Sequence, residues 1–192
     1  MPIDMFLKRK KDILSKKDKS FIGDIDDKIK SLCDRINSLE DCYTTSSCSG
    51  RVVLMIDQEK KDKELMLKIY HNFISFAELK KNLNELLKTG KNIRFKMEPC
   101  ALHVACREFE QAKKFCNDAR VAGWKRTGII SSEKRFVIEM NSTEKLDFPV
   151  IRNRKMLVDD NFLKIIAEEA NEKLERCWRK IEELEKNIGN LS

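Results

Sequence analysis

Glycine is scarce in this sequence, and its spacing does not match the common loops that bind nucleotide phosphates. The chain of 192 residues has only 6 glycines and 3 prolines. No two glycines form a G-x-G pair, which excludes a Rossmann dinucleotide loop and a P-loop. A G-x-S-x-G nucleophile elbow is also absent. If the chain binds a nucleotide cofactor, a different kind of site must hold it.

Long apolar runs and paired cysteine motifs are missing as well. No apolar run approaches the roughly 20 residues that cross a bilayer, and the basic N-terminus lacks the hydrophobic core of a secretory signal. We therefore expect a cytoplasmic protein with no membrane partner. The 7 cysteines include no C-x-x-C pair, and only 2 histidines could supplement them. An odd number of cysteines without a signal indicates buried, reduced thiols, and we expect no metal site.

Charged residues, in contrast, are abundant and unevenly placed. They make up 37% of the chain, hydrophobic residues make up 41%, and the net charge is +7, which is typical of a folded protein with a basic surface. Lysines and arginines concentrate in three segments, at residues 8–19, 107–135 and 152–155. Such segments are often only a solvated face. Three of them in one chain favour an anionic polymer as partner.

The spacing of apolar residues predicts an α+β fold with a mixed, mainly antiparallel sheet, unlike the Rossmann arrangement. Two tandem β-β-α units, at 51–89 and 91–123, precede a β-hairpin of two strands, at 125–131 and 135–141. Residues 142–158, which include Pro149, are expected to be irregular. Helices are expected at 4–17, 25–38, 76–88, 108–122 and 159–189.

These elements predict a single domain over residues 1–192. Its parts are basic N-terminal helices at 4–41, a sheet core at 44–141 and a long C-terminal helix at 159–189. The last helix has one apolar seam, which favours packing within the chain, with a coiled-coil dimer as the alternative. We expect a monomer.

The stretch from Thr44 to Arg51 gathers small hydroxylated residues, a glycine and an arginine directly before an apolar strand. Small side chains let a backbone come close to a ligand, and Arg51 offers a fork of donors to a carboxylate or phosphate. A solvated turn is the alternative. His103 shares one side of an expected strand with Ala105, which leaves room for a ligand, although a structural histidine would fit there too.

Five polar segments occur in order along the chain. They are Asp18-x-Ser20-x-x-Gly23-x-x-Asp26, Thr44-Thr45-Ser46-Ser47-Cys48-Ser49-Gly50-Arg51, Lys96-x-Glu98-Pro99-x-x-Leu102-His103-Val104-x-Cys106-Arg107, Ala122-Gly123-x-x-x-x-Gly128-Ile129 and Ser142-Thr143-x-x-Leu146-x-x-Pro149. Together they resemble the wybutosine-synthesizing tRNA methyltransferase family of archaea and eukaryotes. The resemblance extends from about Phe6 to Lys180. The chain departs from it at Cys42 and Cys100, where the family usually has an aromatic residue.

The resemblance implies a methyltransferase that uses S-adenosylmethionine and has a non-Rossmann α+β fold. Its substrate would be tRNA(Phe), recognised at the anticodon stem-loop. The methyl group would go to the ring nitrogen N4 of a tricyclic 4-demethylwyosine-type guanosine at position 37. Two alternatives stay open: a non-catalytic RNA-binding module, and a thiol or metal enzyme built on Cys48 and Cys106.

Three groups of site residues follow from the motifs and the basic segments. The candidate catalytic residues are His103, Arg51 and Asp26. The candidate residues for binding the methyl donor are Ser46, Ser47, Cys48, Ser49, Gly50, Asp18 and Ser20. The candidate RNA-binding residues are Arg107, Lys8, Arg9, Lys10, Trp124, Arg152 and Arg154. Trp124 would stack on a base, or alternatively belong to the core.

Overall fold

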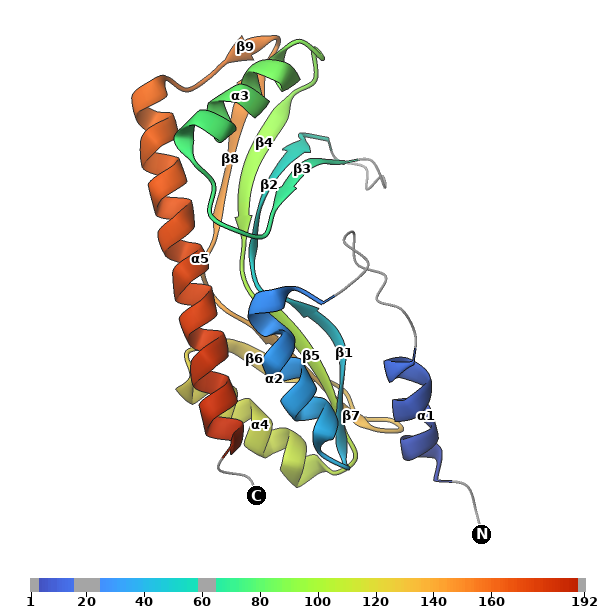
Figure 1. Cartoon of the computed structure of the whole chain (residues 1–192). Coiled ribbons are helices and arrows are strands. Elements are labelled where there is room, and N and C mark those ends of the chain that lie inside the picture. Colours follow the sequence, from blue (N-terminus) through green and yellow to red (C-terminus); the bar gives the residue numbers. More distant parts are fainter. Residues whose placement is uncertain (1–3, 16–24, 59–64, 190–192) are drawn as a thin grey trace. The chain divides into compact units, whose positions relative to one another are not determined.

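A computed structural model describes residues 4–15, 25–58 and 65–189, and Figure 1 shows its helices and strands. In chain order they are α1 (Met5–Leu14), α2 (Asp27–Ser38), β1 (Cys42–Cys48), β2 (Arg51–Ile56), β3 (Met66–Tyr70), α3 (Phe76–Leu87), β4 (Ile93–Glu98), β5 (Ala101–Cys106), α4 (Phe109–Val121), β6 (Arg126–Ser131), β7 (Phe136–Asn141), β8 (Leu146–Arg152), β9 (Lys155–Met156) and α5 (Asp160–Gly189). The α+β class, with antiparallel pairing and a long C-terminal helix, is confirmed.

The chain divides into two compact units, each built on its own antiparallel sheet. The first comprises Met1–Ser49, Cys100–Thr143 and Cys177–Ser192, and the second comprises Gly50–Pro99 and Glu144–Arg176. The first contains a four-stranded sheet in the order β1-β5-β7-β6, and the second a five-stranded sheet in the order β3-β2-β4-β8-β9. The single domain over residues 1–192 stays a prediction.

One face of the four-stranded sheet forms the core of the first unit. Strand residues alternate between faces, and on this side Leu102, Val104 and Ile138 are fully buried. Helix α2 lies on the same side, because the Asn37 Oδ1 atom accepts a hydrogen bond from the Thr44 hydroxyl at 3.1 Å, and Thr44 is the register partner of Val104. The buried residues of α2 and α4 therefore cover the apolar face of this sheet.

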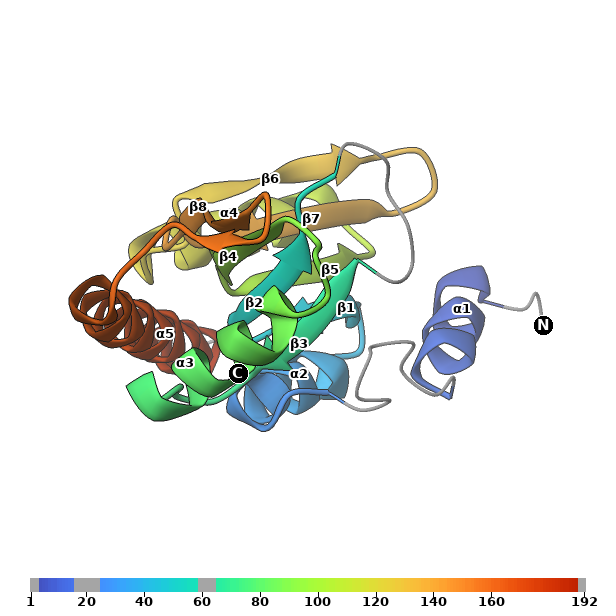
Figure 2. The same ribbon diagram turned by 90° about the horizontal axis from the view of Figure 1, so that it is seen from above.

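The other face of this sheet is covered at one end by α1. Phe6 and Ile13 pack against a cluster formed by Tyr43, Ala105 and Val137. The Asp4 side chain caps the helix by accepting from two backbone N–H groups. Both Figure 1 and Figure 2 show α1 apart from α2, the other N-terminal helix of this unit.

In the second unit, α3 and the first half of α5 lie on the apolar side of the five-stranded sheet. Phe95 stacks on Phe148 at 5.3 Å between ring centroids, and Phe148 meets Phe162 of α5 edge-on at 5.7 Å. Asn171 of α5 exchanges two hydrogen bonds of 2.9 Å with the backbone of Ile74. The opposite face of the sheet carries ion pairs among its side chains, including Arg94 with Asp147 at 2.9 Å.

Two expectations about the strands are wrong. Residues 142–158 are not irregular, because they form β8 and β9. Pro149 is accommodated in β8 at a register shift opposite Arg94, where the ladder is already interrupted and a missing N–H costs less. The second predicted β-β-α unit is also not one unit, because β4 pairs with β2 and β8 in one sheet while β5 pairs with β1 and β7 in the other.

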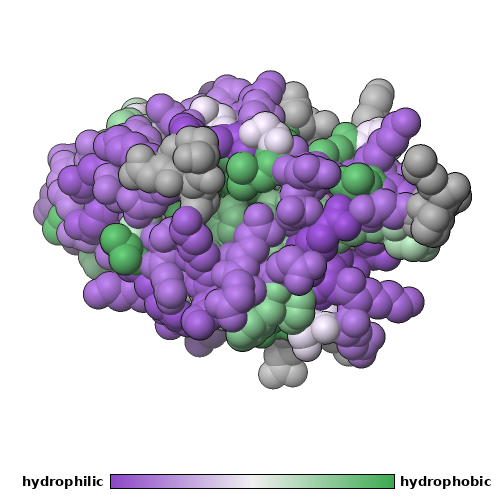
Figure 3. All heavy atoms as spheres, turned by 90° about the horizontal axis from the view of Figure 1, so that it is seen from below, coloured by the Kyte–Doolittle hydropathy of each residue, from purple (hydrophilic) through white to green (hydrophobic). Residues whose placement is uncertain are grey.

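The apolar seam of α5 packs within the chain, as expected. Leu163, Ile166 and Ala170 are buried in the first half of the helix, and Cys177, Ile181 and Leu184 are buried in the second half. No helix in the described ranges is both long and apolar enough to span a bilayer. Hydrophilic side chains dominate the face drawn in Figure 3, and hydrophobic ones are scattered across it in small groups.

Candidate active site

A row of polar and small residues crosses the open part of the four-stranded sheet, on the same face as α1. The register aligns Ser46 of β1, His103 of β5, Glu139 of β7 and Gly128 of β6 side by side. The Nε2 atom of His103 lies 3.1 Å from Oε1 of Glu139, and the two side chains are 32% and 45% exposed. We call these four residues the polar row. It offers solvent a hydrogen-bonded imidazole next to a carboxylate.

The end of β1 beside the polar row is held by Asp26, the N-cap residue of α2. Its Oδ2 atom accepts from the backbone N–H of Ser49 at 2.8 Å and from the Ser49 hydroxyl at 3.1 Å. Gly50 follows with a φ of 96°, a left-handed conformation that favours glycine. The sequence predicts Asp26 and Ser49 as site residues, and the structure brings these two together.

The Ser/Thr stretch is a strand, which changes the orientation of its side chains. Thr44 to Cys48 belong to β1, so neighbouring residues point to opposite faces. Ser46 pairs with His103 on the open face, and Cys48 follows it on that face. Ser47 pairs with Leu102, so the prediction that Ser47 and Ser46 line one pocket wall is wrong. Asp18 and Ser20 lie outside the described residues.

Arg51 and Gly50 belong to the second unit, where Arg51 begins β2. The Nε atom of Arg51 donates to Oε2 of Glu98, its register partner on β4, at 2.7 Å. Arg51 was expected to meet a carboxylate or a phosphate, and the chain itself supplies a carboxylate. A catalytic role of Arg51 stays a prediction.

Arg107 and Lys10 both hold α1 in place. The guanidinium of Arg107 forms ion pairs with Asp4 at 2.7 Å and Asp41 at 2.6 Å, and it lies over the ring of Phe6. The hydrogen bond to Asp4 is the largest of the effects that raise the pKa of Arg107. The ammonium of Lys10 donates to the carbonyl oxygen of Leu39. Both side chains thus have partners within their own unit, and their contact with RNA stays a prediction.

Trp124 is a core residue, so the prediction that it stacks on a base is wrong. Its side chain is 0% exposed, and its Nε1–H donates to the carbonyl oxygen of Lys180 at 3.0 Å. A ring without exposed surface has no face to offer a base. The alternative that the sequence left open, a structural role, is the one that the structure supports.

The other basic candidates are exposed. Lys8 and Arg9 lie on the outer side of α1. Arg152 ends β8, and Arg154 lies in the tight turn that joins it to β9, where Asn153 and Arg154 both have positive φ. This turn is at the opposite end of the five-stranded sheet from Arg51, a separation of about 17 Å along a six-residue strand.

The cysteines do not support a thiol enzyme. All seven fall in described segments and are thiols, and all except Cys48 are buried. The Sγ atoms of Cys42 and Cys106 lie 3.3 Å apart. This contact, followed by burial, raises the pKa of Cys106, which disfavours the reactive thiolate. Within the described ranges, no cluster of three or more His, Cys, Asp or Glu side chains could hold a metal ion.

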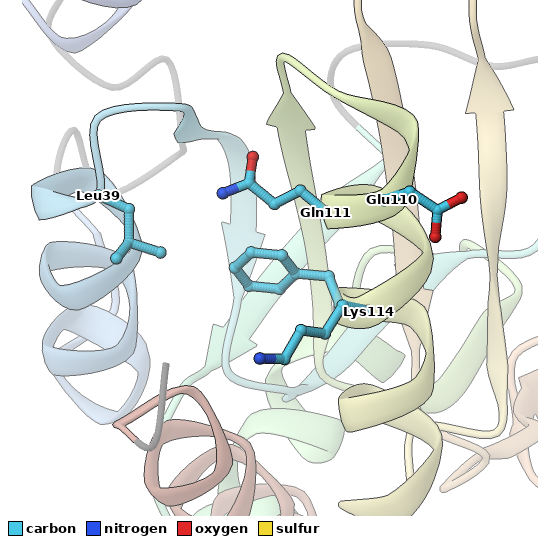
Figure 4. A pocket seen from close by; sticks show the side chains of 5 residues that line it. Leu39, Glu110, Gln111 and Lys114 are labelled. Atoms are coloured by element: carbon cyan, nitrogen blue, oxygen red, sulfur yellow. The ribbon is translucent and has the colours of Figure 1, made fainter. Parts of the chain in front are cut away.

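A cavity of about 360 Å³ lies away from the polar row, between α4 and the end of α2. Figure 4 shows Gln111 and Lys114 extending from α4 toward Leu39, while the carboxylate of Glu110 points away. The cavity contains none of the residues that the sequence singled out. The candidate site is therefore the open sheet face rather than this cavity.

Glu139 is the residue of the polar row that sequence reasoning missed. It lies in an expected strand, but nothing local distinguishes it from the chain's other acidic residues. Its contact with His103 joins residues that are 36 positions apart. Alternation would have placed Glu139 on the face opposite Ile138 and Met140, and only the strand register puts it beside a histidine.

These features define an α+β protein whose antiparallel sheet displays a histidine–carboxylate pair on its open face. A family model described as methyltransferase TYW3 matches residues 8–190. A protein of Archaeoglobus fulgidus is 36% identical over 170 residues, which cover 87% of this chain and 84% of that protein. A protein of Thermococcus sibiricus is 34% identical over 188 residues, which cover 96% and 94% of the two chains.

Two solved structures have the same fold as this chain. A structure of a Pyrococcus horikoshii protein covers 100% of both chains with a TM-score of 0.85 and 30% identity. A hypothetical protein from Aeropyrum pernix has a TM-score of 0.73 and 25% identity, covering 84% of this chain and 96% of that one. The chain belongs to the methyltransferase TYW3 family. Both relatives named above are called tRNA(Phe) 7-((3-amino-3-carboxypropyl)-4-demethylwyosine(37)-N(4))-methyltransferase.

Proposed function

We propose that this protein methylates N4 of the 7-(3-amino-3-carboxypropyl)-4-demethylwyosine base at position 37 of tRNA(Phe), a step of wybutosine biosynthesis. The observation that carries the proposal is the name shared by relatives that are 34–36% identical over most of both chains. The methyl donor is S-adenosylmethionine, which supplies the methyl group as a sulfonium substituent when it is bound.

The polar row supports this chemistry. Methylation of a ring nitrogen that carries a hydrogen requires a group that takes up the proton, and an imidazole with an open ring nitrogen can do so. His103 is our candidate for this base. Ser46 and Cys48 present small side chains on the same face next to it, so a planar base or a nucleoside can approach the sheet backbone. Asp26 fixes the Ser49–Gly50 turn and thereby the shape of this edge.

Holding the two reactants in line contributes more than the base does. Positioning can lower the barrier by roughly 7–11 kcal/mol, whereas a general base contributes about 10²–10⁴-fold. The hydroxyl of Ser46 and the carboxylate of Asp26 suit the hydroxyl and amino groups of the donor, whereas the Ser49 hydroxyl is buried and bonds to Asp26. Arg51, through its guanidinium, is our candidate for the donor carboxylate or an RNA phosphate, and its pairing with Glu98 orients it for that contact.

Exposed basic residues would contact the anticodon stem-loop. Lys8, Arg9, Arg152 and Arg154 are the candidates, since each is exposed. Phosphate contacts make affinity depend on salt, and position 37 lies in a loop, where a base splays out more easily than in a duplex. The protein would act in the cytoplasm, where its thiols stay reduced, and we propose that it is monomeric.

Methylation of tRNA(Phe) isolated from a strain that lacks this enzyme tests the proposal. With S-adenosylmethionine and the purified protein, we expect the modified nucleoside to gain the mass of one methyl group. His103→Ala should abolish the gain while the protein stays folded, and His71→Gln, at the chain's other histidine, should not. Binding of tRNA without any methyl transfer by the wild type would instead indicate a non-catalytic RNA-binding module.

A further inference from the structure

We propose that Glu139 is a positioning residue that fixes the tautomer of His103, so that Nδ1 of the imidazole takes the proton from the acceptor nitrogen. The inference rests on the proposed function, because it gives His103 a defined part in that reaction. Glu139 does not touch a substrate in this proposal. It acts only through the histidine.

The strand register supports a fixed contact between the two side chains. His103 and Glu139 are direct partners on the adjacent antiparallel strands β5 and β7. Directly opposed residues keep their Cβ atoms about 4.5–5.5 Å apart, so the sheet backbone holds both side chains within reach. The contact of 3.1 Å between Nε2 and Oε1 is a hydrogen-bond distance.

The other residues of the polar row carry no carboxylate that could compete with Glu139 for the contact with His103. On the other side of His103 the register places Ser46, and on the other side of Glu139 it places Gly128. A Cβ atom built on Gly128 meets no heavy atom of the described chain within 4 Å. Open space therefore adjoins Glu139, and Glu139 is the one acidic residue in the row.

The chemistry of the pair selects one tautomer. An ionised carboxylate only accepts hydrogen bonds, and a neutral imidazole carries a single N–H. The hydrogen bond made by one ring nitrogen decides which nitrogen is protonated. The proton is therefore held on Nε2 by Glu139, and Nδ1 keeps its lone pair and serves as the base.

The proton and electron balance of the step is simple. The acceptor nitrogen forms a bond to the methyl carbon, the bond between that carbon and the donor sulfur breaks, and its electron pair stays on sulfur. The proton of the acceptor nitrogen passes to Nδ1 of His103. The imidazolium that results lies beside the Glu139 carboxylate, and it returns the proton to solvent, to which both side chains are partly open.

Nitrogen NMR of the imidazoles tests the tautomer directly. The chain has only 2 histidines, so His103 is assigned by comparison with His103→Gln. We expect the wild type to show the Nε2–H tautomer and Glu139→Ala to show a mixture of both neutral forms. A wild-type spectrum dominated by the Nδ1–H form, or one that Glu139→Ala leaves unchanged, would overturn the inference.

Kinetics then tests what the tautomer does for the reaction. We expect Glu139→Ala to lower kcat about 10–100-fold, which is part of the 10²–10⁴-fold typical of a general base. The KM for tRNA and the affinity for S-adenosylmethionine, measured by calorimetry, should stay within about twofold, because Glu139 contacts neither. Glu139→Gln, which keeps an acceptor oxygen, should lose less activity than Glu139→Ala. Glu133→Ala, at an exposed position of the β6–β7 connection, is the matched control.

The outcomes separate this inference from the proposed function. If the wild type methylates tRNA but Glu139→Ala keeps its kcat, the positioning role is wrong and the function stands. If the wild type transfers no methyl group, the proposed function fails, whatever the NMR spectrum shows. An equal loss in Glu133→Ala and Glu139→Ala would indicate general destabilisation and would contradict a specific role for Glu139.

Discussion

Replacing Asp26 tests whether a single carboxylate oxygen holds the turn at the end of β1. Oδ2 of Asp26 accepts from both the N–H and the hydroxyl of Ser49, and Ser49 is fully buried. Hydrogen bonds to charged groups contribute about 1.5–3 kcal/mol each, and a buried donor that loses its acceptor costs about 1–3 kcal/mol. Because the two bonds share one oxygen and are not additive, we expect Asp26→Ala to lower the free energy of unfolding by about 2–4 kcal/mol. For a chain of this length, the melting temperature would fall by about 4–16 °C.

Two further variants divide this effect between its parts. Ser49→Ala removes only the hydroxyl and keeps the backbone bond, so it should cost about 1 kcal/mol. Asp26→Asn keeps an acceptor oxygen without the charge and should fall between Ser49→Ala and Asp26→Ala. The measurement is urea unfolding followed by circular dichroism. Asp27→Ala, at the exposed neighbouring position, is the matched control. If Asp26→Ala lay within about 0.5 kcal/mol of Asp27→Ala, the reasoning would be refuted.

Three other predictions concern the polar row, the basic helix and the core. Gly128→Val should leave the melting temperature unchanged, because the new side chain enters open space and valine suits a strand. It should lower kcat/KM at least about tenfold, because the side chain occupies the face that binds the ligand, and full activity would show that the ligand binds elsewhere. Replacing Lys8 and Arg9 by alanine should reduce the magnitude of the slope of log K for tRNA binding against log salt concentration by about 1–2, measured by binding titrations. An unchanged slope would show that α1 is not part of the interface. Trp124→Phe should lower the free energy of unfolding by about 1–3 kcal/mol without changing tRNA affinity, and weakened tRNA binding in a stably folded variant would contradict its core assignment.

Local periodicity was enough to predict most elements but not how the strands combine. The helix at Phe76–Leu87 follows from apolar spacing and capping residues, and it ends one residue before its expected bound. The strand that contains Pro149 was missed because proline is read as a breaker. Its place at a register shift depends on β4, more than fifty residues earlier in the chain, which local spacing does not reveal.

The candidate site shows the same limit. The sequence singles out His103, Asp26 and Ser49 because they lie in unusual polar segments. It does not reveal Glu139, whose significance depends on the pairing of β5 with β7. It also does not reveal that two carboxylates hold Arg107, because they are 103 and 66 positions away. Charged residues are easy to identify, whereas their partners depend on tertiary structure.

The open face of the four-stranded sheet changes character within two residues along β5 and β7, and within three along β1, where the register shifts. The row beneath α1 is formed by Tyr43, Ala105 and Val137, and the next row on the same face is formed by Ser46, His103 and Glu139. Apolar residues require a cover, and Phe6 and Ile13 of α1 provide it. The polar row requires none, because His103 and Glu139 bond to each other and both side chains are partly exposed. The boundary between packing and chemistry is therefore set by strand residues two or three positions apart, and α1 covers the apolar row while the histidine–carboxylate pair stays open to a substrate.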